Sequence, residues 1–482
     1  LVRVKNLASM STYLFQALIA LYLVAAPTIG FSTGLSWHDE QRLGQLCLFV
    51  VICFWILSPV NRQAIFSAPR LLDRRVPQAL CLLTLLGILS AVSAPLPRWA
   101  LIELATTGLM IFLAFSLAGM RRTQGGRFDS WGLGVCIASA AAYLAGVAVA
   151  YSAVFFEGLP LFVWQLFHGF SNIRFFGHFQ SMTLPLLVLP ALIWQVKPYQ
   201  RGALAVLCSG WWMLAIASGT RGTWLGMGVA FFVSILFQQP GRDWLRAQIK
   251  FLLIGTFGYV LFFEALPTLF GIGGSTIASS RLANITSLSG REVLWLQALN
   301  MISTHPLLGI GPMHFANYPN GVAAHPHNAI LQWTAEWGLP SAALLISGIA
   351  LGFRSLFRQI RSKSGDDKNH LLRIALFLSL IAASTQSLVD GVIVMPYSQT
   401  WLAIIVGWTI GLHLDNAAPW AARGAAPAKT WILLLTLVLC IGIVFYGTHD
   451  HIGHLSERQD FFTLKHGGII MPRYWEQGLI FE

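Results

Sequence analysis

Long apolar stretches recur from one end of the chain to the other, and no other feature constrains its fold as much. A helix needs roughly 20 apolar residues to cross the hydrocarbon core of a membrane, and these stretches are near that length. Charged residues make up only 10% of the chain and hydrophobic residues 56%, whereas a soluble globular protein has about 25% charged residues. The sequence therefore predicts an all-α integral membrane protein, a polytopic bundle of about 12 to 13 transmembrane helices with a large helical loop on one side.

The spacing of the stretches divides the chain into four parts. Residues 1–268 form the first part of the bundle, with an outer segment at 154–178, and residues 340–447 form the second part. Between them, residues 269–339 form a helical loop that carries the candidate chemistry, and residues 448–482 form a short outer tail. The stretches lie at 11–30, 42–60, 78–96, 99–119, 130–153, 179–196, 202–218, 223–238, 250–268, 340–357, 371–389, 397–413 and 430–447. The first lacks a small-residue cleavage site, so we expect it to remain a span.

Basic residues predict the orientation of the bundle, because short cytoplasmic loops are enriched in Lys and Arg. Most of the 31 Lys and Arg residues fall in alternate connections, which we therefore place in the cytoplasm. The segments 154–178, 269–339 and 448–482 then lie on the outer side. The basic residues that run against this bias are Arg42, Arg98, Arg174, Arg221, Arg281, Arg291, Arg458, Lys465 and Arg473. Each of them needs a local reason for its position.

Charge and cysteine usage exclude two classes of function. The net charge of +12 mostly follows from the topology, and no soluble domain with interleaved basic and aromatic residues is present to bind nucleic acid. All six cysteines lie within apolar stretches, without a Cys-x-x-Cys pair or a histidine cluster beside them. We therefore expect no nucleic-acid partner, no disulfides and no zinc site.

The loop 269–339 contains a first predicted helix after Ser289. Ser289 and Glu292 have the spacing of a capping box, and a broad apolar face follows until His305. This helix should have about four turns and lie at the membrane surface or against the bundle.

A second helix is predicted in "HPHNAILQWTAEWGLP". Asn328 is a suitable N-cap, residues 329–337 form the body, and Gly338 ends the helix. His325 and His327 then lie in the loop just ahead of the helix, facing whatever cavity the outer loops enclose.

Three arginines share a polar or glycine-containing context at the outer ends of spans. They are Arg174 in "SNIRFFGHFQ", Arg221 in "SGTRGTWLG" and Arg291 in "SGREVLW". A lone interfacial arginine is usually an anchor whose charged end reaches water. Three of them together with a histidine pair indicate an anion site instead, because the planar guanidinium stays charged and matches phosphate oxygens bidentately. A diphosphate leaving group would need such a site.

The pair His325 and His327 has three interpretations. A histidine can take a proton from an attacking hydroxyl group near neutral pH. Two histidines in an irregular loop could also bind a metal ion, although no third ligand is evident. They could finally be incidental neighbours of the cap at Asn328. The sequence leaves open which histidine of the pair would contact a substrate.

Further titratable residues lie at outer positions. Among the carboxylates near the outer ends of spans, Asp390 in "LVDGVIVMPYSQ" is the best candidate, because an ionisable group at such depth is costly unless it is used or paired. We expect Asp390 to pair with one of the arginines. The remaining histidines of these regions could pack or bind substrate, and they are His178, His305 and His314.

The ordered set of motifs resembles the O-antigen ligase and polymerase superfamily of bacterial inner membranes. The resemblance is carried by "GTRGTWLG", "SGREVLW", "HPLLGIGPMHF" and "HPHNAILQWTAEWGLP", in this order after a set of apolar spans. The stretch "RFFGHFQSMTLPLL" looks like the ligase-type members. The similarity is strongest over residues 170–400, and it is specific as an ordered set rather than in any single motif.

This resemblance implies a glycosyltransferase of the bacterial inner (cytoplasmic) membrane whose active site faces the periplasm. Its donor would be O-antigen polysaccharide on undecaprenyl diphosphate, and its acceptor a sugar hydroxyl of the lipid A-core, so that lipopolysaccharide is completed. The resemblance further implies no metal and no other cofactor. Membrane lipids would be its other partners.

Residue by residue, the family's essential arginines correspond to Arg221 and Arg291, and Arg174 matches less tightly. Its essential histidine falls in the His-x-His-Asn element, at His327 rather than His325. The histidine would deprotonate the acceptor hydroxyl while the arginines hold the diphosphate, and a single displacement would invert the anomeric centre. Further candidates for binding the substrate are Gln180, Asn328 and Asp390.

Three other functions remain open. An O-antigen polymerase would use the same donor with a second lipid-linked glycan as acceptor. A protein O-oligosaccharyltransferase would glycosylate Ser or Thr, although the outer tail adds no sizeable domain. A transporter for a lipid-linked anion would carry polar groups deep in several spans and helices broken mid-span, whereas the polar groups here gather on one side.

Overall fold

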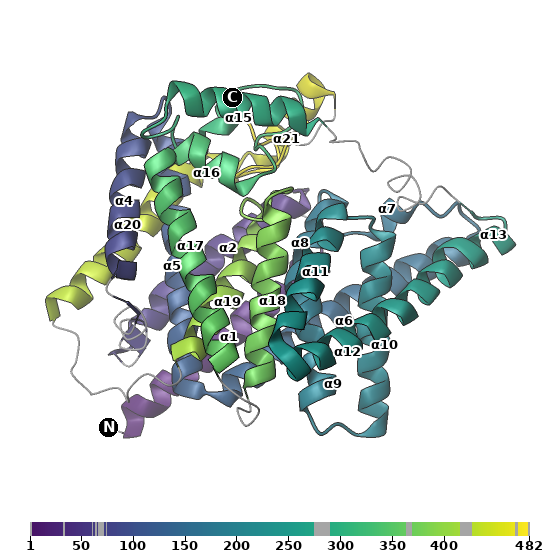
Figure 1. Cartoon of the computed structure of the whole chain (residues 1–482). Helices are drawn as coiled ribbons and strands as arrows, with labels where there is room; N and C mark the ends of the chain where they lie inside the picture. Colours follow the sequence, from purple (N-terminus) through teal and green to yellow (C-terminus); the bar gives the residue numbers. More distant parts are fainter. Residues whose placement is uncertain are drawn as a thin grey trace.

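The computed structural model describes most of the chain, and the described residues form helices and no strand (Figure 1). These residues are 2–31, 34–59, 61–62, 65, 72–73, 75–273, 290–362, 369–414, 427–467 and 471–480. Two residues named above, Arg281 and Ser289, lie outside them.

The helices follow one another along the chain with short connections. Their bounds are α1 Val2–Ala25, α2 Trp37–Ile56, α4 Arg75–Ser93, α5 Pro97–Gln124, α6 Gly126–Phe156, α7 Val163–Leu166, α8 Ile173–Leu187, α9 Leu189–Ile193, α10 Pro198–Ala217, α11 Arg221–Ser234, η1 Ile235–Phe237, α12 Gln238–Tyr259, η2 Val260–Ala265, α13 Leu266–Leu269, α15 Arg291–Thr304, η3 His314–Asn317, α16 Ala329–Trp337, α17 Leu339–Ser362, α18 His370–Ser387, α19 Pro396–His413, α20 Pro427–Ile452 and α21 Leu455–His466.

Every apolar stretch predicted from the sequence overlaps one of these helices. In the described part of the chain, 8 helical stretches are long and apolar enough to cross a membrane. One of them, 221–269, contains a sharp turn, because Gln238 adopts a left-handed φ of 54° between α11 and α12. The structure agrees with a polytopic membrane protein, whereas the predicted number of 12 to 13 spans is not confirmed.

Helices α15 and α16 lie across one end of the bundle, at the top of Figure 1. α15 begins at Arg291, with Gly290 at its N-cap in the left-handed conformation, φ 78°. Gly290 supplies no side chain to cap the helix, and the capping box predicted from Ser289 lies outside the described residues. Leu294 of α15 is buried against Ala335 of α16, so the two helices share a small core of their own.

The sequence prediction for α16 is confirmed in detail. The side chain of Asn328 accepts hydrogen bonds from the backbone N–H groups of Ile330 and Leu331, both at 3.0 Å. These are two of the donors that the start of a helix leaves without a helical partner. Gly338, with φ 83°, follows the last residue of the helix.

α8 is the most enclosed of the candidate spans. Together with α9 it has 83% of its apolar window buried inside the protein, whereas α17 has 11%. Pro185 lies inside α8, and the helix ends at Leu187 before α9 begins. Proline lacks an N–H donor, and a helix end leaves carbonyl groups without helical partners, so this break needs donors from elsewhere.

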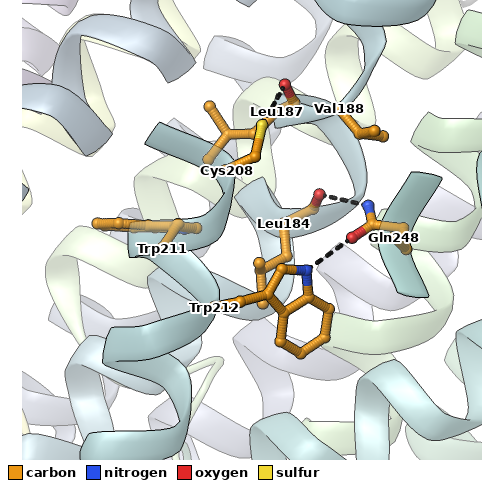
Figure 2. A pocket seen from close by; sticks show the side chains of 7 residues that line it. All are labelled: Leu184, Leu187, Val188, Cys208, Trp211, Trp212 and Gln248. Atoms are coloured by element: carbon orange, nitrogen blue, oxygen red, sulfur yellow. Dashed lines mark hydrogen bonds between the residues drawn. The ribbon is translucent and has the colours of Figure 1, made fainter. Parts of the chain in front are cut away.

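Side chains from α10 and α12 supply these donors (Figure 2). The amide nitrogen of Gln248 donates to the carbonyl of Leu184 at 2.8 Å, and its oxygen accepts from the Trp212 indole at 3.0 Å. The thiol of Cys208 donates to the carbonyl of Leu187 at 3.3 Å. A helix can be broken inside a membrane only when its backbone is satisfied in this way. The small hollow drawn in Figure 2 therefore belongs to the packing of α8 and offers no set of convergent polar groups to a ligand.

Small residues let α8, α11 and α18 approach closely. A Cβ added to Gly226 of α11 would lie 2.6 Å from the carbonyl oxygen of Ala382 in α18. A Cβ added to Gly177 of α8 would lie 2.4 Å from the methyl group of Thr220. Larger residues at either position would force the helices apart.

Polar side chains then join the same three helices. The hydroxyl of Thr223 donates to the carbonyl of Gly177 at 3.0 Å, and the amide of Gln386 donates to Thr223 at 3.4 Å. The hydroxyl of Ser181 donates to the side-chain oxygen of Gln386. This network fixes the starts of α8 and α11 relative to the end of α18.

Replacing Gly226 should separate helices that carry the candidate site. We expect Gly226→Ala to destabilise the protein by about 1–3 kcal/mol, because the added methyl group meets backbone atoms of α18. Gly228→Ala is the matched control on the same helix, since nothing lies within 4 Å of its added Cβ and alanine favours a helix by about 1 kcal/mol over glycine. Thermal unfolding in detergent measures both. Equal melting temperatures for the two variants would contradict the close approach.

Candidate active site

Three arginines stand at the starts of helices. Arg221 and Arg291 are the first residues of α11 and α15, and Arg174 is the second residue of α8. All three side chains are half-buried. The first turn of a helix has N–H groups without helical partners and a partial positive charge, so each arginine adds a full charge to an end that already attracts anions.

The charges of these arginines act on one another. Burial lowers the pKa of Arg291, Asp390 opposes this effect, and the charges of Arg174 and Arg221 lower the pKa further. The guanidinium nevertheless stays protonated, as arginine does throughout proteins. Three helix starts that are distant in the sequence therefore converge on one region of positive charge, which is suited to a polyanion.

His327 has an unusual backbone conformation directly before α16. Its φ is 52°, in the left-handed region that residues other than glycine seldom adopt. The N–H of His327 donates to Nδ1 of His325 at 3.3 Å, and Asn328 caps the helix immediately afterwards. Such strain persists only where the surroundings enforce it, and it concentrates at functional sites.

The two histidines of this loop have different surroundings. His325 is 2% exposed, and its ring lies 2.6 Å from the place that a Cβ on Gly391 would take. The His327 side chain is 13% exposed, and the two rings meet edge to face with centroids 4.1 Å apart. Burial lowers the pKa of His325 well below its usual value, so His325 is a neutral support for the ring of His327.

Asp390, in the loop between α18 and α19, contacts two imidazoles. Its Oδ1 lies 3.3 Å from Nδ1 of His327, and its Oδ2 lies 3.4 Å from Nε2 of His178 in α8. The backbone N–H of Gly391 donates to Oδ1 at 2.9 Å. The arginine partner predicted for Asp390 is thus replaced by histidines, while the charge of Asp390 still acts on Arg291.

These contacts leave Asp390 ionised and His327 neutral. Burial alone would raise the pKa of Asp390, but His178 and His327 hold it well below its usual value. Burial lowers the pKa of His327, Asp390 opposes this, and Arg174 and Arg291 add to the lowering. We assign the proton of neutral His327 to Nδ1, because Asp390 accepts on that side, and Nε2 is then available to accept a proton.

The C-terminal segment 471–480 is buried along its whole length. Arg473 donates to the carboxylate of Glu336 in α16 at 2.7 Å and lies 3.4 Å from Glu103 of α5. The charge of Arg473 also acts on His325. Arg473 therefore ties the segment to the helix that follows the histidine loop.

The same segment reaches the chain ahead of α8. The backbone N–H of Glu476 donates to Asp39 of α2 at 2.8 Å, and the hydroxyl of Ser171 donates to Glu476 at 2.6 Å. Ser171 precedes Arg174 by three residues. The segment thus bridges the two sides of the site, a role that sequence reasoning missed because the tail shows no periodicity or charge run.

Some basic residues that run against the charge bias are explained by such contacts. Arg42 donates to the carbonyl of Tyr474 at 3.2 Å, within the C-terminal segment. Arg98 pairs with Asp450 at the surface. These arginines therefore join segments at the same end of the bundle as α15 and α16.

The structure does not place the side chain of Gln180 beside the histidines and Asp390 of the candidate site. Its side chain is fully buried, and its amide donates to the carbonyl of Trp211 in α10 at 2.9 Å. Two helical residues span about 200° of rotation, so Gln180 and His178 face opposite sides of α8. This placement gives Gln180 a structural role instead of the predicted contact with substrate.

The other predicted groups are also placed. His314 is buried and accepts from the N–H of Leu96 at 2.9 Å, whereas His305 is exposed. Asn328 uses its carbonyl oxygen as a helix cap, and its contact with substrate stays a prediction. Within the described segments, no three His, Cys, Asp or Glu side chains are arranged to hold a metal ion.

Residues 203–346 match a family model described as O-Antigen ligase. No curated protein matches the chain. The match supports the O-antigen ligase/polymerase superfamily, whose glycosyltransferase-like members act on lipid-linked polysaccharides in a membrane. It includes Arg221, Arg291 and His327, whereas Arg174 and Asp390 lie outside it.

The Arg473–Glu336 pair tests whether the buried segment supports the site. Arg473→Met should destabilise the protein by about 3 kcal/mol, because Glu336 then lacks its buried partner. Loss of one partner from a buried ion pair costs about 3–5 kcal/mol. The lower value is expected here because burial raises the pKa of Glu336 to about 7, so this carboxylate can take up a proton. Arg98→Met removes an exposed pair and should cost at most about 1 kcal/mol.

Thermal unfolding in detergent compares these variants. The double variant Arg473→Met/Glu336→Leu should recover part of the lost stability, since no uncompensated charge remains on α16. If Arg473→Met melts together with Arg98→Met, the buried pair does not hold the segment in place.

Proposed function

We propose that this chain is an O-antigen ligase of the bacterial inner membrane with its active site on the periplasmic side. It would transfer O-antigen polysaccharide from undecaprenyl diphosphate to a sugar hydroxyl of the lipid A-core, completing lipopolysaccharide. The observation that carries the proposal is the 3.3 Å contact between Nδ1 of His327 and the Asp390 carboxylate, beside the interacting charges of Arg174, Arg221 and Arg291.

The arginines would bind the diphosphate of the donor. Negative charge develops on the bridging oxygen as the glycosidic bond breaks, and preorganised donors that face this charge stabilise the transition state. Arg174, Arg221 and Arg291 supply guanidinium groups next to helix starts, so the leaving group would meet both full charges and the positive ends of helix dipoles. This arrangement supports a diphosphate better than a neutral leaving group.

His327 would act as the base toward the acceptor. Its Nε2 takes the proton of the sugar hydroxyl while the hydroxyl oxygen bonds to the anomeric carbon. The bond from that carbon to the diphosphate oxygen breaks, and its electron pair leaves with the diphosphate. The imidazolium formed is stabilised by Asp390, as a carboxylate does for a catalytic histidine elsewhere. One displacement inverts the anomeric centre and needs no metal.

Charge and placement together support a periplasmic active site. The charge bias predicts that Arg291 and His327 lie on the side opposite the connections rich in Lys and Arg. An acceptor that approaches from the periplasm would therefore meet α15 and α16 first. The acceptor distinguishes this function from an O-antigen polymerase, which would extend a second lipid-linked glycan instead.

Reconstituted transfer tests the function directly. Purified protein in liposomes that contain lipid-linked O-antigen and lipid A-core should produce a ladder of extended lipopolysaccharide, without nucleotide and in the presence of EDTA. His327→Ala should lower the rate by about 10²-fold or more, because the base is lost. His305→Ala is the matched control, since His305 is an exposed histidine of the same segment.

The outcomes separate the alternatives. Elongated lipid-linked glycan without extended lipid A-core would identify a polymerase, and chelator-sensitive transfer would rule out the metal-free step. A His327→Ala variant as active as His305→Ala would remove the base assignment.

Arg221→Lys tests the role of guanidinium geometry. We expect a loss of about 10-fold to 100-fold in kcat/KM for the lipid donor, because a lysine keeps the charge but cannot bind two phosphate oxygens in one plane. Arg246→Lys, at an exposed position of α12, controls for the substitution itself. Transfer at the wild-type rate in Arg221→Lys would show that only charge neutralisation matters.

A further inference from the structure

His178 is a buried imidazole that the transfer step above does not use. It lies in α8 with a relative exposure of 0%, and among the described residues neither of its ring nitrogens makes a regular hydrogen bond. Nε2 lies 3.4 Å from Oδ2 of Asp390, on the opposite carboxylate oxygen from His327. Its polar contact is therefore directed at the group that supports the base.

The cost of this arrangement indicates that it has a purpose. Burying a polar group without a full hydrogen bond costs roughly 1–3 kcal/mol, and an apolar side chain of similar size would avoid that cost. The ring of Phe175 packs against His178, with centroids 5.7 Å apart, so an apolar neighbour already shapes the site. A histidine is of use here only if its contact with Asp390 matters.

The position of His178 on α8 links it to the anion site. Residues four apart lie on one face of a helix, so Arg174 and His178 project from the same side of α8. His178 lies one turn deeper, at the level of the buried carboxylate. One helix face thus provides a cation for the donor and a neighbour for Asp390.

We propose that His178 is a positioning residue that acts through Asp390 on His327. Its Nε2–H faces Oδ2 and holds the carboxylate so that Oδ1 points to Nδ1 of His327. By sharing the negative charge of Asp390, His178 keeps the proton affinity of His327 low enough for the base to release its proton after each transfer. This inference rests on the proposed function, in which His327 accepts the proton of the acceptor.

Other charged and titratable groups of the packed elements act on the surroundings of Asp390. Arg174 of α8 and Arg291 of α15 act on His327, and Arg221 of α11 acts on Arg291. His325 of the loop interacts with both histidines that flank Asp390, and the charge of Arg473 in the C-terminal segment acts on His325. The arginines stay protonated over the working pH range. A change in the pH dependence of His327 after substitution of His178 therefore reports the loss of His178 itself.

The test compares His178→Leu with His178→Gln. Leucine removes the donor, whereas the amide nitrogen of glutamine can take the place of Nε2 and donate to Oδ2. In reconstituted transfer, His178→Leu should lower kcat by about 10-fold to 100-fold with little change in the KM for donor, as loss of outer hydrogen-bond partners does for histidines at metal sites. His178→Gln should recover a large part of kcat.

The pH profile gives a readout that a merely structural role would not move. Without His178, the negative charge of Asp390 acts on His327 alone and holds its proton more strongly. The acidic limb of the pH–rate profile should therefore move to higher pH by about half a unit. His178→Gln should return the limb toward its wild-type position. Thr183→Val, which removes a buried hydroxyl group five residues along α8, should leave the limb unchanged.

A second measurement separates this inference from the proposed function. Diethyl pyrocarbonate acylates neutral imidazoles, and mass spectrometry of the labelled full-length protein follows His327 against pH without any substrate. The pH midpoint of His327 labelling should be higher in His178→Leu than in the wild-type protein. This result is expected even if the wild-type protein transfers no glycan, in which case the proposed function is refuted but the role of the His178–Asp390 contact is supported. His178→Met serves as a second apolar variant if the leucine variant does not fold.

The opposite results would overturn the proposal. They are an unchanged labelling midpoint in a folded apolar variant, equal losses of kcat in His178→Leu and His178→Gln, or a rise in KM at constant kcat, which would make His178 a substrate contact.

Discussion

A buried carboxylate stays ionised only with partners around it, and the arrangement of this end of the bundle depends on that requirement at Asp390. Its two oxygens face imidazoles from different parts of the chain, His327 before α16 and His178 in α8. Asp390 itself follows α18 in a short loop. Three segments must therefore meet within hydrogen-bonding reach, and the arginines are grouped around the place where they meet.

Residues without reactive groups maintain that meeting point. In a membrane, helices associate through close packing and interhelical hydrogen bonds, because lipid is as apolar as the side chains. Gly177 and Gly226 allow α8, α11 and α18 to approach, and Thr223 and Gln386 join them. The positions of Arg174, at the start of α8, and of Arg221, at the start of α11, follow from this packing. At the other side, the C-terminal segment links α16 to the chain ahead of α8 through Arg473 and Glu476.

The sequence predicted those parts of the structure that depend on local patterns. Every apolar stretch that hydropathy predicted overlaps a helix, and the cap at Asn328 and the stop at Gly338 predicted α16. The contacts between residues distant in the sequence could not be predicted from local patterns. His178 and Asp390 are 212 positions apart, so neither residue signals the other, and the burial of 471–480 depends on surfaces that only the fold creates. Gln180 was predicted to bind substrate, but its side chain contacts the carbonyl of Trp211, on the face of α8 opposite His178.

The electrostatics of the site explain why a base can work among arginines. A region that attracts a diphosphate also repels protons, which is why Arg174 and Arg291 lower the pKa of His327. In the proposed function, His327 is therefore neutral before the acceptor arrives, but it would bind the transferred proton too weakly without compensation. Asp390 supplies the compensation, and binding of the donor's own negative charge adds to it. The proton affinity of His327 should therefore rise when the diphosphate is bound, so that the base becomes strong enough only when a donor is in place.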